Sequence, residues 1–161
     1  MGCLRILSEN TSRKHIKVAK YVVLNTVKTF NGTMKIPCEL VVWYVLPTIR
    51  REVAKELVDN HNMSQAEVAR RFGVTDAAIS QYLKKKRGDN PLIDESPHHD
   101  MFMNEIRSAA KRIASDNAEF ASEICSICLV VKKIGMLAKI YEVHMGCEPP
   151  TCACDPAIVP Q

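Results

Sequence analysis

The chain has 161 residues and a formal net charge of +4, with 47% hydrophobic and 25% charged residues. This length suits one domain, or one domain with a small appendage, and the composition is that of an ordinary globular protein. The sequence shows neither a signal-peptide pattern nor a membrane-span pattern, so we expect a cytoplasmic protein with no membrane partner. The mild basic excess permits nucleic-acid binding without arguing for it.

Residues 1–33 carry little pattern. They mix polar residues with a β-leaning run and end in an Asn-Gly-Thr sequence just before Met34. Two interpretations stay open: an N-terminal strand or arm, or an extension that precedes a true start at Met34. We expect this extension to be poorly ordered, and we place the first domain at residues 34–90.

Residues 38–60 are predicted to be helical because apolar side chains recur at spacings of three and four. The expected buried face consists of Val42, Val45, Leu46, Ile49, Val53 and Leu57. Charged residues, among them Arg50 and Arg51, would form the solvent-exposed face. Pro47 is expected to open a second helical piece or to kink a longer helix.

Two short helices joined by a tight turn are predicted over residues 64–88. Ser64 followed by Glu67 is a capping box, which signals the start of a helix. Gly73 would end that helix in the left-handed conformation, and Thr75 would cap the next one. The inward-facing apolar residues would be Val68, Phe72, Ile79 and Tyr82 or Leu83. This combination predicts a helix-turn-helix, against the alternative of an ordinary helical hairpin.

The second helix, predicted at residues 76–86, would be the recognition helix in the major groove of double-stranded DNA. Gln81 carries the groups to pair with an adenine edge, and Ala77 can touch a thymine methyl group. Ser80 and Thr75 can reach bases or phosphates.

Basic residues supply the predicted phosphate contacts. The dense run from Lys84 to Arg87 would neutralise phosphates, although cations at a helix end are also favoured by the helix dipole. Arg70 and Arg71 on the first helix are further candidates. The predicted DNA-binding residues are Thr75, Asp76, Ala77, Ser80, Gln81, Lys84, Lys85, Lys86, Arg87 and Arg70.

The C-terminal half is predicted as a linker at residues 91–97 and a helical segment with a Pro-rich tail at residues 98–161, which makes the fold class all-α. One apolar stripe consists of Met103, Ile106, Ala110, Ile113 and Ala114, and another of Phe120, Ile124, Ile127 and Val131. The first stripe either packs inside the monomer or forms the contact of a homodimer. We expect a homodimer, because two recognition helices would then meet two half-sites. Gly135 is expected to interrupt the last helix.

Five of the seven cysteines gather near the C-terminus: Cys125, Cys128, Cys147, Cys152 and Cys154. In a reducing compartment, clustered cysteines indicate metal ligands or redox thiols rather than disulfides. On a helix the first two would lie about 5–6 Å apart at Cβ, which suits two thiolates on one metal. Three interpretations stay open: a 4Fe–4S cluster, a structural zinc site, or thiols without metal. His144 is a weaker candidate ligand.

The stretch from Pro37 to Gly88 resembles the archaeal predicted transcriptional regulators that carry an XRE-type (lambda-repressor-like) helix-turn-helix. Members of that family combine a short all-helical DNA-binding domain with a helical segment that contains cysteines. The resemblance extends over roughly residues 35–154, implies DNA binding and favours the 4Fe–4S cluster. Ala138 stands where the family pattern has a thiol, which is a departure from its ligand set.

We therefore predict a sequence-specific DNA-binding transcription regulator whose cluster would sense redox, iron or sulfur state. The alternatives are a zinc-stabilised or metal-free DNA-binding module, an adaptor that docks to the transcription machinery, and a thiol redox enzyme. The sequence shows no phosphate-cradling glycine loop and no Ser-His-Asp or His-Glu-x-x-His set, so we expect neither an enzyme nor a small-molecule substrate.

Overall fold

A computed structural model describes residues 37–116 and 118–146, with side chains from Glu39 onward. Within these ranges every regular element is a helix, which confirms the all-α prediction. The elements are α2 (Pro37–Leu40), η1 (Val41–Val45), α3 (Leu46–His61), α4 (Gln65–Phe72), α5 (Asp76–Leu83), α6 (Pro91–Asp94), α7 (His99–Ala114), α8 (Phe120–Lys133) and α9 (Met136–Met145). The predicted N-terminal extension lies outside the described residues, as do Cys147, Cys152 and Cys154.

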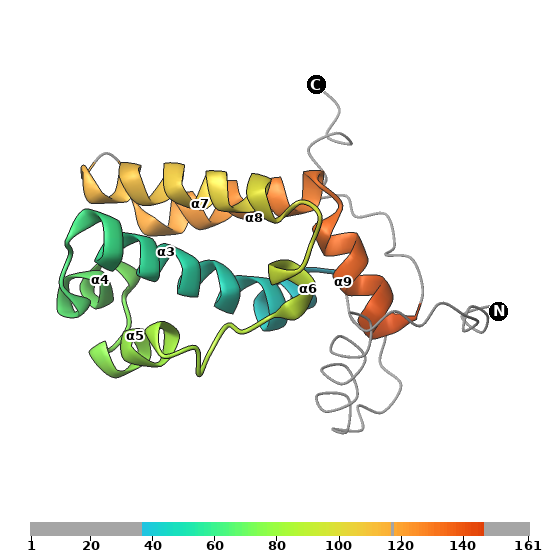
Figure 1. Cartoon of the computed structure of the whole chain (residues 1–161), viewed down its shortest axis with the longest axis horizontal. Coiled ribbons are helices and arrows are strands. Elements are labelled where there is room, and N and C mark those ends of the chain that lie inside the picture. Colours follow the sequence, from blue (N-terminus) through green and yellow to red (C-terminus); the bar gives the residue numbers. More distant parts are fainter. Residues whose placement is uncertain (1–36, 117, 147–161) are drawn as a thin grey trace.

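Helix α3 lies at the centre of the molecule (Figure 1). The antiparallel helices α7 and α8 run along one side of α3, while α4 and α5 pack on its other side. A shared apolar core joins both sides, and its fully buried side chains include Ile49, Val53, Leu57, Ile79, Ile106 and Ile127. Among the helices of the described ranges, none combines the length and the apolarity that crossing a membrane requires.

The helix predicted at residues 38–60 contains a π-helical turn, η1, immediately before α3. Pro47 lies in the first turn of α3, where its missing N–H removes one α-helical hydrogen bond. The wider π turn shifts the register of the residues that precede it. As a result Val42, predicted to be buried, is 57% exposed, and its neighbour Trp43 is 68% exposed. Val45, Ile49, Val53 and Leu57 are buried as predicted, whereas Leu46 is half-buried.

Residues 91–97, predicted as a linker, instead contain the short helix α6. The side-chain oxygen of Asn90 accepts a hydrogen bond from the Leu92 N–H at 3.1 Å, and Pro91 occupies the first helical position. Asn and Pro are favoured at these two places because one caps a free N–H and the other lacks one. Ile93 is fully buried in the common core, so this segment is part of the folded body.

The apolar stripe of α7 lies inside the monomer. Ile106, Ala110 and Ile113 are buried, while Met103 and Ala114 are half-buried. Phe102, which the predicted stripe did not include, is also buried, and α7 packs against both α3 and α8. Of the two interpretations of this stripe, the structure supports packing within the chain. Gly135, with φ +76°, separates α8 from α9, which confirms the predicted interruption.

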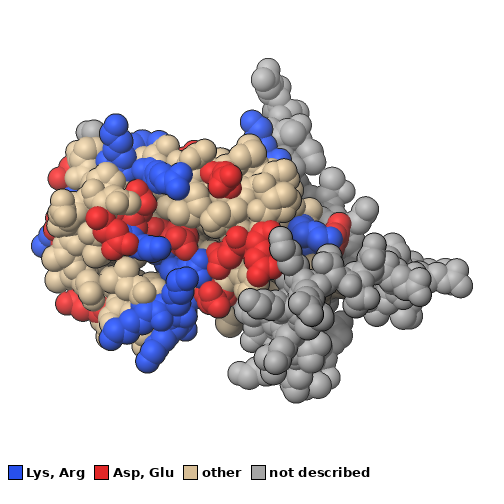
Figure 2. Space-filling view, viewed as in Figure 1, with Lys and Arg blue, Asp and Glu red and all other residues tan. Residues whose placement is uncertain are grey.

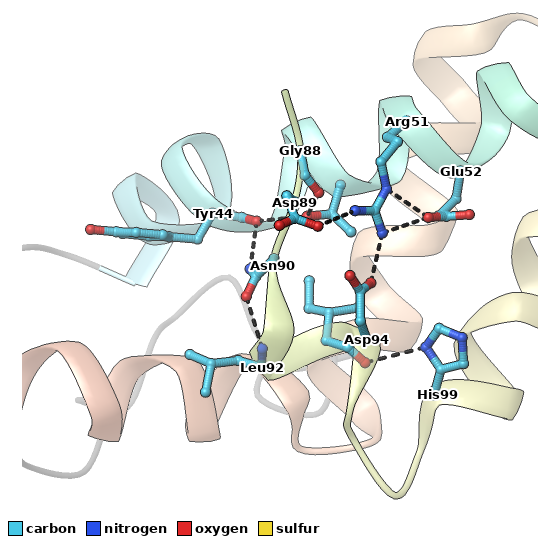
Figure 3. Close-up of polar contacts among 11 residues, drawn as sticks. Tyr44, Arg51, Glu52, Gly88, Asp89, Asn90, Leu92, Asp94 and His99 are labelled. Atoms are coloured by element: carbon cyan, nitrogen blue, oxygen red, sulfur yellow. Dashed lines mark hydrogen bonds and ion pairs between the residues drawn. The ribbon is translucent and has the colours of Figure 1, made fainter. Parts of the chain in front are cut away.

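Arg51, predicted on the exposed face of α3, is only 4% exposed. Its guanidinium donates to Glu52 at 2.7 Å and to Asp94 at 2.6 Å (Figure 3). Asp89 accepts a third hydrogen bond at 3.2 Å. Burial alone would lower the pKa of Arg51, but the hydrogen bonds and charges of Asp94 and Glu52 outweigh it and raise the pKa above its ordinary value. The buried cation therefore stays charged and holds α3 to the segment that follows α5.

Gly88 fixes the same segment to the start of α3. Its carbonyl accepts a hydrogen bond from the Thr48 hydroxyl at 2.9 Å, and the Asn90 amide donates to the Tyr44 carbonyl at 2.9 Å. Gly88 has φ +78°, and a Cβ at this position would lie 2.3 Å from the carbonyl oxygen of Pro47. Only glycine satisfies both the conformation and the close approach.

We predict that Gly88→Ala lowers the free energy of unfolding by about 2–4 kcal/mol, because a left-handed penalty adds to a backbone clash. Gly135→Ala is the matched control. It has a similar φ of +76° but nothing within 4 Å of its added Cβ, so it should cost only about 1–2 kcal/mol. Denaturant unfolding of both variants measures the difference. Equal losses of unfolding free energy in the two variants would show that the close approach of Gly88 to Pro47 contributes nothing to stability.

Candidate nucleic-acid interface

Helix α4 begins and ends where its local signals predict. The Ser64 hydroxyl accepts a hydrogen bond from the Glu67 N–H at 3.2 Å, which satisfies one free donor of the first turn. Val68 and Phe72 bury the inner face. Gly73 ends the helix at φ +63°, in the left-handed conformation that the tight turn requires.

Helix α5 follows directly. The Thr75 hydroxyl accepts from the Ala78 N–H at 3.3 Å, so the predicted second cap is confirmed. Ile79 and Tyr82 are buried, and α5 packs against both α3 and α4. Two short helices joined at Gly73 and backed by a third helix constitute a helix-turn-helix.

The side of α5 opposite this core is open to solvent. Thr75, Asp76 and Ala77 are exposed, while Ser80 and Gln81 are half-buried. Within the described part of the chain, the side chains of Ser80 and Gln81 form no hydrogen bond, so their polar groups remain available to a ligand. The predicted recognition residues therefore lie on one accessible surface, although the base contacts assigned to them remain predictions.

The recognition helix is shorter than predicted, since it ends at Leu83 rather than at Lys86. The N–H of Lys86 donates to the Gln81 carbonyl at 2.9 Å, and the N–H of Lys85 donates to the Tyr82 carbonyl at 3.0 Å. These are the two hydrogen bonds of a Schellman ending, in which one residue turns left-handed and the helix stops. Lys84–Arg87, here termed the basic loop, therefore follow the helix instead of continuing it.

All four side chains of the basic loop are exposed, and none forms an ion pair with another described residue. Figure 2 shows a dense patch of Lys and Arg at the lower edge of the molecule, over the end of α5. The neighbouring carboxylates of Asp89 and Asp94 form ion pairs with Arg51. Uncompensated cations beside an accessible helix are suited to contacts with phosphates.

Arg71, considered as a phosphate contact, is instead committed to the C-terminal helices. Its guanidinium donates to the Ile113 carbonyl at 2.8 Å and pairs with Asp116 at 2.6 Å. Arg70 is exposed and lines a shallow hollow between the end of α4 and the start of α8. Its contact with DNA stays a prediction.

A ring stack connects the helix-turn-helix to α8. Phe72, in the last turn of α4, lies 3.8 Å from Phe120 between ring centroids, with the planes 16° apart. Phe120 is the first residue of α8, the helix that carries Cys125 and Cys128. The predicted sensor helix therefore contacts the predicted DNA-binding element directly.

Of the five clustered cysteines, the structure describes Cys125, which is exposed, and Cys128, which is half-buried. Burial, and then the charge of Cys125, raise the pKa of the Cys128 thiol to about 11. No group of three or more His, Cys, Asp or Glu side chains that could hold a metal occurs within the described ranges. His144 stacks its ring on Tyr44 at 3.9 Å. The metal predictions are therefore untested.

Sequence reasoning missed the residues that hold the basic loop in place. Thr48 and Arg51 meet partners about forty positions away, at Gly88, Asp89 and Asp94, so no local pattern indicates their role. The cap at Asn90 did have a signal, because Asn directly before Pro is typical of a helix start.

Comparison with known proteins gives one match. Residues 55–88 match a family model described as helix-turn-helix. The match covers the C-terminal part of α3, both short helices and the basic loop. No curated protein and no solved structure gives a significant match. Within the described, all-helical residues, geometry and family match together show a helix-turn-helix, which supports an XRE-like DNA-binding domain.

Proposed function

We propose that the protein is a sequence-specific DNA-binding transcription regulator. The observation that carries this proposal is the accessible side of α5 next to an unpaired basic loop, within a segment that matches a helix-turn-helix family. A major groove about 12 Å wide accepts a single helix, and phosphates flank it. The open helix face and the adjacent cations fit these two requirements.

Sequence reading would come from the outward side chains of α5. Gln81 would donate to and accept from an adenine edge, and Ala77 would contact a thymine methyl group. Ser80, between them on the helix, would hydrogen-bond a base or a phosphate. The basic loop would fix the register on the DNA backbone without reading bases.

A regulator of this type would bind as a homodimer, because two recognition helices then meet two half-sites one helical turn apart. The α7 stripe is buried inside the monomer, so the dimer contact would use another surface. Measuring the molar mass of the free protein and of its DNA complex by light scattering tests this part of the proposal. A monomer on a palindromic duplex would contradict it.

We further propose that Cys125 and Cys128, with cysteines of the C-terminal tail, bind a 4Fe–4S cluster or, as the alternative, zinc. Their three-residue spacing on α8 supports two thiolates on one metal. A ligand bound to α8 would influence the conformation of the helix-turn-helix through the stack of Phe120 on Phe72. Such a cluster would make DNA binding responsive to redox, iron or sulfur state.

Substitutions in α5 should change the sequence preference of DNA binding, whereas substitutions in the basic loop should change its overall affinity. Gln81→Ala should relax the preference at one base pair by roughly 1–3 kcal/mol, whereas Lys86→Ala should weaken all duplexes alike and lower the salt slope by about 1. Titrations of specific and mixed-sequence duplexes at several salt concentrations separate the two effects.

The matched control is Lys111→Ala, which removes the same charge from an exposed site on α7, across α3 from α5 (Figure 1). It should leave DNA binding unchanged. If Lys86→Ala and Lys111→Ala behave identically, the basic loop does not contact phosphates. Binding without any sequence preference would favour the adaptor alternative.

Metal binding should depend on pH. Because the pKa of Cys128 is raised to about 11, its thiol is protonated near neutral pH and must lose a proton to become a ligand. Affinity for iron or zinc should therefore increase from about pH 6.5 to 8.5. Cys128→Ser should reduce this dependence, because the remaining thiol ligands still release protons, and the neighbouring Ser126→Ala should keep it in full.

The metal itself is identified by anaerobic purification followed by reconstitution with iron and sulfide. A brown protein that contains iron supports the cluster, and stoichiometric zinc supports the alternative. A colourless protein without either metal rules out both.

A further inference from the structure

The residue that turns the chain away from the end of α5 is a lysine in the left-handed conformation. Lys85 has φ +53°. The other left-handed residues at helix ends in the described chain are Asn62, Gly73, Asp116, Gly135 and Gly146, and aspartate shares the short polar side chain of asparagine. Glycine has no Cβ to clash, and asparagine is tolerated because its short polar side chain can hydrogen-bond locally. Lysine has neither property, so this position carries a backbone strain that glycine would remove.

The surrounding structure does not let Lys85 relax. On its N-terminal side, the hydrogen bonds of Lys85 to Tyr82 and of Lys86 to Gln81 require the left-handed turn. On its C-terminal side, the chain reaches Gly88, whose carbonyl is held by Thr48 at 2.9 Å. The loop is fixed at both ends, and its corner falls on Lys85.

Nothing within the described chain compensates for this strain. The Lys85 side chain is exposed and makes no ion pair or hydrogen bond there. Its sequence neighbours Lys84, Lys86 and Arg87 are all cations, which repel it. A lysine at this corner therefore lowers the stability of the folded chain through both its backbone and its charge.

We propose that Lys85 contacts a phosphate of the DNA backbone from a position that glycine would occupy more stably, so that fold stability and DNA affinity oppose each other at this residue. This rests on the proposed function. The anchored corner holds the backbone of Lys85 in one conformation before DNA arrives, so only the side chain is ordered on binding. Strained conformations that the surrounding structure enforces gather at functional sites.

The test is Lys85→Gly, measured for thermal stability and for binding to a short fluorescent duplex of mixed sequence. The melting temperature should rise by roughly 2–4 °C as the strain is relieved. Affinity at low salt should fall about three- to tenfold, and the slope of log affinity against log salt should decrease by about 1.

Three variants separate conformation from charge. Lys84→Gly removes the same charge at a residue with φ −82°, so it should reduce affinity without raising the melting temperature. Lys85→Gln keeps the strained backbone and removes only the charge, so it should lose affinity while its melting temperature rises less than that of Lys85→Gly. Lys85→Arg should retain the salt slope.

A melting temperature for Lys85→Gly that is unchanged or lower overturns the proposal, as does an unaltered salt slope. The proposed function fails separately, if the unmodified protein shows no salt-dependent binding to the duplex. In that case the stability measurements still report on the strain alone.

Discussion

The guanidinium of Arg51 lies where three parts of the chain meet: the central helix α3, the segment after α5, and α6. A buried cation must be paired, because its transfer from water costs several kcal/mol that only close carboxylates offset. Asp89 and Asp94 can reach it only if the chain after the basic loop returns to α3. The position of the proposed DNA-contacting loop relative to the core therefore depends on this charged group, together with the hydrogen bonds of Gly88 and Asn90.

A few further contacts position the rest of the proposed DNA-binding surface. Buried Ile79 and Tyr82 set the rotation of α5, so that Ser80 and Gln81 turn outward. The docked Gly88 sets where the loop ends. The C-terminal helices contact the helix-turn-helix at the end of α4, through Arg71 and through the ring stack of Phe120 on Phe72. A change in α8 would thus act on the turn of the helix-turn-helix while the loop stays fixed.

The sequence was sufficient where the determining contacts are local. Ser64, Gly73 and Thr75 act within one helical turn, and the predicted boundaries of α4 and the start of α5 were confirmed. The end of α5 was missed because lysine is a good helix former and no Gly or Asn marks the stop. Arg51 was wrongly predicted to be exposed because its partners are remote in sequence. Val42 was wrongly predicted to be buried because a π turn leaves no periodic signal. The clustered cysteines of the tail lie outside the described residues.

The burial of the α7 stripe against α3 has a consequence for how the protein can be divided. The helix-turn-helix and helices α7 and α8 share one set of apolar side chains. A fragment cut after the basic loop would leave bare the flank of α3 that packs against α7 and α8. A chimera that borrows this helix-turn-helix must therefore include α7 and α8 as well, because they cover the other flank of α3.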